Sequence, residues 1–178
     1  MDARNLREYY LPAFEMAVKE GNVRSVMSAY NALNGIPCGA NHELLIDILR
    51  TEWGFNGFVT SDCGAVDDVY QSNRHHFVNT AAEASAVSIV NGEDLNCGNT
   101  FQDYCKEAIE KGYMQEADLD TALVRGFEAR FSVGEFDNAS NVPWRSISDD
   151  VLDCEEHRQL AYKAAQEAIV LLKNNNNI

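Results

Sequence analysis

One aspartate stands out in this sequence because it directly follows a short apolar run. Residues 57–63, Gly-Phe-Val-Thr-Ser-Asp-Cys, have the pattern of a buried strand that ends at Asp62. In parallel α/β folds the carboxyl ends of the strands carry the active site, since the loops converge there. A carboxylate at such an end could act as a nucleophile. The alternative is that Ser61 or Asp62 only caps the helix that follows.

The flanking segments predict the parallel strand–helix–strand arrangement that such a site requires. Residues 26–30 read as the preceding strand. Asn41 can cap a helix that Gly54 ends, and this helix places Leu44, Leu45, Ile48 and Leu49 on one face. The connection at residues 31–41 is long and rich in turn formers, so we expect it to reach over the mouth of the site.

The rest of the chain, up to a polar stretch that begins at residue 134, is also predicted to consist of helices and a strand. The periodicity predicts helices at residues 6–18, 81–90, 101–111 and 117–133, with a short strand at residues 94–96. Residues 134–153 are polar and aperiodic and contain Pro143, which indicates a linker between domains. After it we predict a helix at residues 155–167, an apolar strand at residues 168–172 and a surface loop at residues 174–177.

Length, composition and charge limit the classes of function. The 178 residues suit one ordinary domain, but a complete eight-unit barrel needs about 250, so the chain reads as a piece of a larger fold. An apolar fraction of 46% and an aromatic fraction of 10% indicate a globular core. The net charge of −14 disfavours nucleic acid and anionic membrane as partners. No run approaches the ~18 apolar residues of a membrane span, and the first residues predict an amphipathic helix rather than a signal peptide.

Four motifs, in order along the chain, resemble the latter half of the catalytic barrel in glycoside hydrolase family three. They are Val-Met-Ser-Ala-Tyr-Asn at residues 26–31, Asn-Gly-Ile-Pro at 34–37, Leu-Arg-Thr-Glu-Trp-Gly-Phe at 49–55, and Ser61-Asp62. The sequence Cys-Gly-Ala-Val at residues 63–66 is similar to the β-xylosidase-like branch, because many β-glucosidases of the family have Trp after the aspartate. The resemblance implies an α/β fold: the C-terminal part of a (β/α)8 TIM-like barrel at residues 1–133, a linker at 134–153, and the start of a second α/β sandwich domain at 154–178.

The resemblance also implies an activity. Members are exo-acting retaining β-glycosidases, so the expected function is that of a β-xylosidase with α-arabinofuranosidase activity; β-glucosidase is the alternative within the family. Asp62 would be the nucleophile that forms the glycosyl-enzyme intermediate on an oligosaccharide or an aryl or alkyl β-glycoside. The acid/base glutamate would lie beyond this chain, so we expect the chain alone to be inactive. A non-catalytic carbohydrate-binding relic of the barrel is the competing interpretation. The family implies a secreted or periplasmic location.

Two more residues match family positions in the sugar pocket. Tyr30 corresponds to a tyrosine beside the nucleophile, where a phenol can donate a hydrogen bond to the carboxylate. Met27 corresponds to a position that lines the same pocket. For a lone tyrosine or methionine on an apolar strand, core packing is the more usual role.

The cysteines suggest a disulfide at the rim of the site. Cys63 and Cys97 each come one step past the carboxyl end of a predicted strand. Neighbouring parallel strands run about 4.8 Å apart, which a disulfide can bridge. Such a bridge would narrow the space beside Asp62 and favour a pentose, which lacks the exocyclic hydroxymethyl group of a hexose. Two free buried thiols are the open alternative, because five cysteines are an odd number.

The sequence offers no pattern for a metal or a cofactor. His42-Glu43 begins like a zinc-protease helix, but Ile46 occupies the place of the second histidine. His75 and His76 would point to opposite faces of a strand, and no phosphate-binding glycine loop is present. For the adjacent acidic residues Glu93 and Asp94 the sequence favours a structural role. Residues 138–140 form a glycosylation sequon in the exposed linker, which has meaning only in a eukaryotic secretory protein.

Overall fold

Two short parallel strands hold the part of the chain that carries Asp62. Strand β1 (Ser25–Ser28) pairs with β4 (Phe58–Ser61), with Ser28 opposite Ser61. On the other edge of β4, Thr60 forms a parallel bridge with Leu95. Because Phe58 to Ser61 are alternately half-buried and buried, one face of β4 packs on helices while the other does not.

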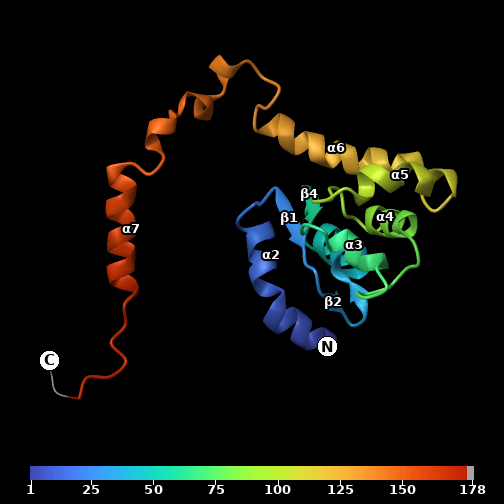
Figure 1. Ribbon diagram of the computed structural model, residues 1–178, viewed down its shortest axis with the longest axis horizontal. Helices are drawn as coiled ribbons and strands as arrows, with labels where there is room; N and C mark the ends of the chain where they lie inside the picture. Colours follow the sequence, from blue (N-terminus) through green and yellow to red (C-terminus); the bar gives the residue numbers. More distant parts are fainter. Residues whose placement is uncertain (176–178) are drawn as a thin grey trace. The chain divides into compact units, whose positions relative to one another are not determined.

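The computed structural model describes residues 1–175 and separates the chain into two units (Figure 1). The first unit is Met1–Glu135, and the second begins at Phe136. The first unit contains both sheets and the helices that surround them. The second contains the 3-10 turns Ala139–Asn141, Pro143–Ser146 and Asp149–Val151 and the helix α7 (Glu155–Ala168). The domain limits expected from the sequence stay a prediction.

A wide helical segment covers the buried face of the two strands. This segment, η3 (Glu43–Glu52), has π-type hydrogen bonding, and Asn41 caps it by accepting a bond from the Leu44 amide at 3.2 Å. Gly54 follows with a φ of 73°, which a glycine adopts without strain and which ends the segment. Side chains from this segment and β4 form one apolar cluster, which comprises Leu45, Leu49, Phe55 and Val59.

Four α-helices follow β4, and the last three of them build a second apolar cluster. They are α3 (Ala65–Tyr70), α4 (Ala81–Val90), α5 (Thr100–Glu110) and α6 (Glu116–Ser132). Thr80 and Glu83 form a capping box at the start of α4, which fixes where that helix begins. The cluster contains Ala82, Ala86, Ile89, Cys105, Ala108, Met114 and Ala122. The predicted helices in this region are therefore present within a residue or two.

The amino-terminal helix is not the continuous element that the periodicity predicted. It consists of α1 (Ala3–Asn5), the π-type turn η1 (Leu6–Tyr10) and α2 (Pro12–Lys19). Pro12 has no amide proton to donate to the preceding turn and is favoured at the first position of a helix, so α2 begins there.

The segment between β1 and η3 also differs from the prediction. Strand β1 ends at Ser28 rather than at Tyr30. The long connection contains a small hairpin, β2 (Ala32–Leu33) with β3 (Ile36–Pro37). Asn34 and Gly35 both have positive φ angles, 51° and 90°, as a two-residue hairpin turn requires.

Three further predictions about strands are wrong. Residues 94–96 contribute only the single bridge at Leu95, and residues 169–172 have no strand partner and are 71% to 92% exposed. A strand needs a neighbour for its backbone hydrogen bonds, and the described chain supplies none there. His75 lies in a turn and His76 directly after it, so they are not on a strand. Of the loop predicted at residues 174–177, Asn176 and Asn177 lie outside the described residues.

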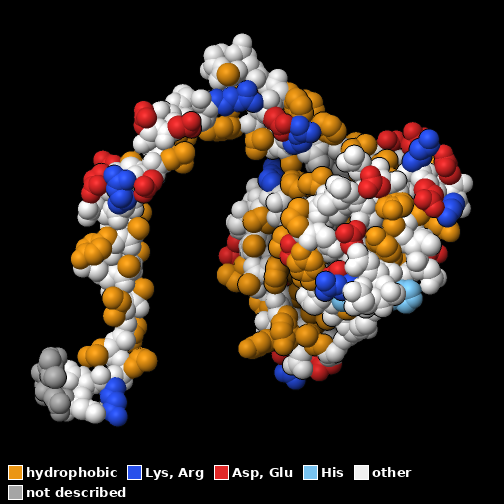
Figure 2. Space-filling view, in the orientation of Figure 1, with side chains coloured by type: hydrophobic (Ala, Val, Ile, Leu, Met, Phe, Trp, Pro, Cys, Tyr) orange, Lys and Arg blue, Asp and Glu red, His pale blue; other side chains and the backbone are white. Residues whose placement is uncertain are grey.

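The sheet does not close into a barrel within residues 1–175, because β1 pairs with β4 alone. Beside β1 lies an apolar cavity of about 420 Å³ between the amino-terminal helices and η3. Hydrophobic side chains gather on this side of the first unit (Figure 2). The cavity wall includes Leu6, Phe14, Met27, Leu45 and Trp53. Among the described helices none is both long and apolar enough to cross a membrane.

Candidate active site

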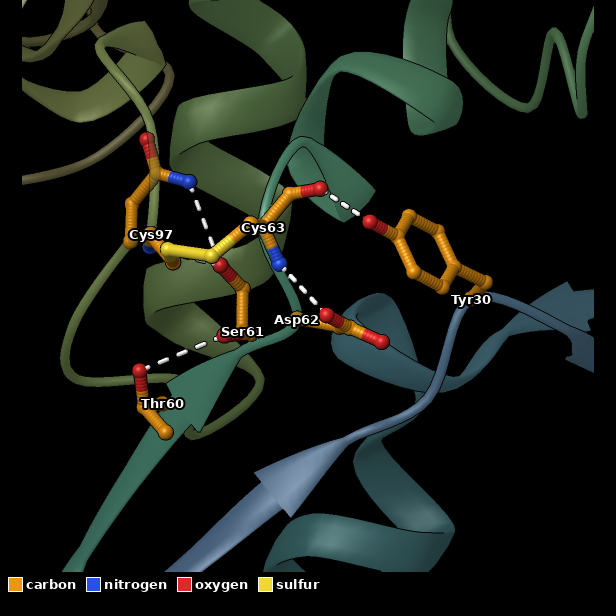
Figure 3. The surroundings of a disulfide bond; sticks show 7 residues. Tyr30, Thr60, Ser61, Asp62, Cys63 and Cys97 are labelled. Carbon is orange, nitrogen blue, oxygen red and sulfur yellow. Dashed lines mark hydrogen bonds between the residues drawn. A yellow bond between two sulfur atoms is a disulfide. The ribbon is translucent and has the colours of Figure 1, made fainter.

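Asp62 lies directly after β4, at the carboxyl ends of both parallel strands (Figure 3). Its amide donates to the Ser28 carbonyl oxygen at 3.2 Å, which continues the ladder between the strands by one bond. Its carboxylate Oδ1 accepts from the Cys63 amide at 2.7 Å, while Oδ2 is left available beyond the strand end. Asp62 is only partly buried, so it keeps some contact with solvent.

Tyr30 reaches the same place from the segment after β1. Its hydroxyl donates to the Cys63 carbonyl oxygen, beside the Asp62 carboxylate that the sequence suggested as acceptor. Desolvation, followed by the negative charges of Asp62 and Asp68, raises the pKa of Tyr30. A raised pKa keeps the phenol protonated, so it remains a hydrogen-bond donor beside the carboxylate.

His75 supports Tyr30 from the other side, a role that the sequence did not indicate. Its Nε2 lies 2.6 Å from the Tyr30 carbonyl oxygen. The His75 amide donates to the Asp68 carbonyl oxygen at 3.0 Å, which ties the turn after α3 to that helix. Only the tertiary fold brings this turn to Tyr30, because 45 residues separate the two along the chain.

A disulfide joins Cys63 to Cys97 next to Asp62, with Cα atoms 4.3 Å apart. Two hydrogen bonds hold the same two segments together: the Cys97 amide donates to Ser61 Oγ at 2.9 Å, and the Gly64 amide donates to the Cys97 carbonyl at 2.8 Å. Cys38 and Cys105 are buried as free thiols and Cys154 is a half-buried one. The structure thus brings Asp62, Tyr30, Cys63 and Cys97 into one group (Figure 3).

Met27 is not in this group. It lies opposite Thr60 in the ladder, is 57% exposed, and lines the apolar cavity beside β1. Neither Asp62 nor Tyr30 lines that cavity. The large cavity therefore lies beside β1, which in the described chain pairs with β4 alone, and is not the pocket around the Asp62 carboxylate.

Asp94 has a structural position between two arginines. Its carboxylate contacts Arg50 at 2.5 Å and Arg125 at 3.0 Å, and it accepts a bond from the Val59 amide at 2.8 Å. Its side chain is 1% exposed. These contacts join η3 and α6 to β4 and occupy both carboxylate oxygens, in agreement with the role that the sequence favoured.

Glu93 is fully buried, with 0% of its surface exposed. Ser28 Oγ donates to its Oε1, while Oε2 has no hydrogen-bond partner among the described residues. The Ser88 hydroxyl lies nearby but also has no hydrogen-bond partner among the described residues, which leaves Ser28 as the one donor to Glu93 there. Burial raises the pKa of Glu93 to about 7 despite the hydroxyl neighbours.

Sequence reasoning overlooked Ser61, His75 and Glu93 as contributors to the site. For Ser61 a signal exists, because it alternates with Asp62 along the strand and must therefore face the helices. For Glu93 the sequence shows only an acidic pair and cannot tell which carboxyl is paired. Across residues 1–175, no group of three or more His, Cys, Asp or Glu side chains is arranged to hold a metal ion.

Comparison with known proteins identifies the family to which the chain is similar. The model of the "Glycosyl hydrolase family 3 N terminal domain" matches residues 1–128. A "Probable exo-1,4-beta-xylosidase" of Aspergillus fumigatus is 42% identical over 181 aligned positions, which cover 100% of this chain. Among solved structures, an exo-β-xylosidase in complex with a xylobiose aziridine probe is 37% identical over 98% of this chain, with a TM-score of 0.88.

A second solved relative acts on a different sugar. It is a β-glucosidase from Listeria innocua in complex with glucose, 33% identical over 100% of this chain, with a TM-score of 0.85. The chain spans only 23% or 24% of the length of these three relatives. Most of each relative therefore has no counterpart in the residues described above.

Proposed function

The chain belongs to glycosyl hydrolase family 3, and on that premise we propose that it supplies the nucleophile of an exo-acting retaining β-glycosidase. The proposed nucleophile is Asp62, and the proposed substrate is the terminal β-linked sugar of an oligosaccharide or an aryl or alkyl glycoside. In the full-length protein, this chain would form the later strands of the catalytic barrel. The observation that carries the proposal is the carboxylate of Asp62 at the shared carboxyl end of two parallel strands.

The surroundings of Asp62 suit a nucleophile. One carboxylate oxygen accepts from the Cys63 amide, which fixes the orientation of the carboxylate. The other oxygen is the one that would form the bond to the anomeric carbon. Tyr30, held beside it through Cys63, keeps a donor within the same small region.

We propose that the second carboxyl group lies elsewhere in the full-length protein. A retaining glycosidase needs an acid/base about 5 Å from its nucleophile. Neither Glu93 nor Asp94 is a candidate for the acid/base. Asp94 is paired with Arg50 and Arg125, and Glu93 is fully buried.

A pentose is the proposed sugar. The disulfide at Cys63 stands where it would limit space beside the nucleophile, and xylosidases are among the relatives that cover the whole chain. We expect β-xylosidase activity, with α-arabinofuranosidase activity as a second pentose reaction. The β-glucosidase relative keeps glucose as the alternative sugar, and a sugar-binding relic without turnover is the alternative class.

The test is covalent labelling of the full-length protein. Incubation with a 2-fluoroxyloside that has a good leaving group should trap a glycosyl-enzyme, since the fluorine slows hydrolysis of the intermediate. Peptide mapping by mass spectrometry should place the sugar on the peptide with Asp62. A 2-fluoroglucoside is the parallel reagent.

Each outcome decides a different part of the proposal. Xylose on Asp62 supports the nucleophile, the retaining mechanism and the pentose together. Label from the glucoside alone overturns the pentose but leaves the mechanism. Label on another residue overturns Asp62, and no label from either sugar makes the binding relic the better interpretation.

A further inference from the structure

Glu93 is a buried acidic residue that the proposed chemistry does not use. It lies in the layer between the sheet and the helices and is 0% exposed. Burying a carboxyl group costs free energy unless its hydrogen bonds are made, and here only one of its two oxygens has a partner in the described chain. A buried polar group that is kept at such a cost usually holds neighbouring segments in one arrangement, which an apolar side chain would not specify.

The bonded oxygen fixes the end of β1. Ser28 donates its hydroxyl to Glu93, and its carbonyl accepts the amide of Asp62 at 3.2 Å. Ser28 therefore joins the buried carboxyl to the backbone of the proposed nucleophile. Tyr30 follows Ser28 by two residues, so the same anchor sets where the segment with the phenol leaves the strand.

The carboxyl group also fixes the turn that closes this segment. A Cβ atom at Gly39 would lie 2.8 Å from Glu93 Oε2 and 2.9 Å from Oε1, so the backbone of the turn rests against both oxygens. The Cys38 amide in that turn donates to the Asn31 carbonyl at 3.1 Å. Glu93 thus holds both ends of the segment that contains Tyr30, one through Ser28 and one through the turn.

Resting on the proposed function of Asp62, we propose that Glu93 is a positioning residue: it holds the end of β1 and the Gly39 turn so that Asp62 and Tyr30 keep their mutual geometry. Glu93 touches no substrate in this role. Catalytic side chains tolerate little displacement, because a shift of about 1 Å can lower a rate roughly a hundredfold. Loss of a residue that holds them in place should therefore slow the reaction.

The test uses the full-length protein and three variants. Glu93→Ala removes the contacts with both Ser28 and the Gly39 turn, whereas Glu93→Gln keeps an acceptor for Ser28 and nearly the same volume. Ile89→Ala removes apolar packing from the cluster of α4, α5 and α6 and is the control for general destabilisation. We expect Glu93→Ala to slow the covalent labelling of Asp62 by roughly tenfold or more while the concentration for half-maximal labelling changes little. Glu93→Gln should restore most of the rate, and Ile89→Ala should label normally while folded.

A second readout does not depend on activity. Hydrogen exchange of the peptides that contain Ser28 and Asp62 should be faster in Glu93→Ala than in Ile89→Ala at matched distance below the melting temperature. Wild-type rates of both labelling and exchange in Glu93→Ala would overturn the inference, as would equal effects of Ile89→Ala. If the wild type is not labelled at all, the proposed function fails, and exchange alone then decides the role of Glu93.

The melting temperature should also depend on pH through this residue. The groups that face Glu93 are the hydroxyls of Ser28 and Ser88, the Cys38 thiol and the Asp94 carboxylate. Its pKa is raised from 4.5 to about 7 in the folded protein, so its contribution to stability is full below about pH 4.5 and is lost as pH rises to about 7. Glu93→Gln should remove that part of the decline; an unchanged profile would contradict an ionisable Glu93 in the core.

Discussion

Ser61 and Asp62 are neighbours in the chain with opposite tasks, because side chains alternate across a strand. Ser61 is buried among the helices, where its hydroxyl accepts from the amides of Asn96 and Cys97. Asp62 extends past the strand and keeps one carboxylate oxygen available. A shift of register by one residue would exchange the two side chains, so the β1–β4 pairing is what places the aspartate rather than the serine at the position of the proposed nucleophile.

Removal of the Asp62 carboxylate should stop hydrolysis by the full-length protein. We expect Asp62→Ala to lower kcat/KM by at least about a thousandfold, because no covalent intermediate can form. Azide should restore some turnover of an activated glycoside, since the small anion can occupy the place of the carboxylate. Asp120→Asn, at an exposed position of α6, is the matched control. Normal turnover in Asp62→Ala would show that another residue is the nucleophile.

Tyr30→Phe should weaken catalysis without loss of the fold. The side chain is 45% exposed, so the ring packing that remains is enough to keep the segment folded. Loss of the hydroxyl removes the donor to the Cys63 carbonyl beside Asp62, and we expect a roughly tenfold to hundredfold fall in kcat/KM. Steady-state kinetics with an aryl xyloside measure it. An effect on the melting temperature alone would assign Tyr30 a structural role only.

At the scale of elements, the buried charges of Asp94, Arg50 and Arg125 join two helical segments to the sheet. Asp94→Ala would leave Arg50 buried without its partner and the Val59 amide without an acceptor. Such an uncompensated charge destabilises a protein by about 3–5 kcal/mol. The melting temperature of the full-length protein should fall by several degrees.

An exposed ion pair serves as the control for this prediction. Glu107 and Lys111 lie 2.7 Å apart on the surface of α5. Exposed pairs contribute about 0–1 kcal/mol, so Glu107→Gln should leave the melting temperature almost unchanged. Equal effects of the two substitutions would mean that the Asp94 cluster is not the buried anchor described above.

The disulfide is the second feature that joins elements. Peptide mapping without reductant should recover Cys63 and Cys97 in one linked pair of peptides; separately alkylated peptides would contradict the bridge. A bridge across a sequence separation of 34 residues stabilises a fold by about 4 kcal/mol in the chain-entropy model. A Cys63→Ser and Cys97→Ser double variant should melt at a lower temperature. It should also discriminate less between xylosides and glucosides, because the rim beside Asp62 can then widen.

At the scale of the whole molecule, one edge of β1 has no neighbouring strand among the described residues, and the apolar cavity next to it is uncovered. The cavity of about 420 Å³ is lined almost entirely by apolar side chains, and such a surface in a soluble domain is normally covered. The chain also spans only about a quarter of its relatives. Both observations are consistent with a sheet that gains its remaining strands from the rest of the full-length protein.

The isolated chain should therefore show no glycosidase activity and should expose this apolar surface. We expect the purified 178-residue chain to bind a hydrophobic dye and to leave aryl xylosides and glucosides intact. The full-length protein is the control for both measurements. Measurable turnover by the chain, abolished by Asp62→Ala, would contradict the prediction that the acid/base lies elsewhere.

The sequence by itself determined the local elements and their order. Apolar periodicity located η3 and α4 well, because helices form from contacts three or four residues apart, and Asn41 and Gly54 mark the ends of η3 locally. Alternation located β4 and placed Asp62 just past its end. The strands predicted at residues 94–96 and 168–172 were wrong: the first forms only the bridge at Leu95 and the second forms none in the described chain, since strand pairing depends on residues far away in the chain.

Only the tertiary structure decided which side chains meet. It brought His75 to the carbonyl of Tyr30, gave the Tyr30 hydroxyl the Cys63 carbonyl as an acceptor, and placed Met27 in the wall of a separate cavity. It also separated the acidic pair: Asp94 is neutralised by two arginines, whereas Glu93 is buried against Ser28 with a raised pKa. Residue types and spacing state what a group can do, but burial and charge partners are set by contacts between distant segments, and these decide what it does.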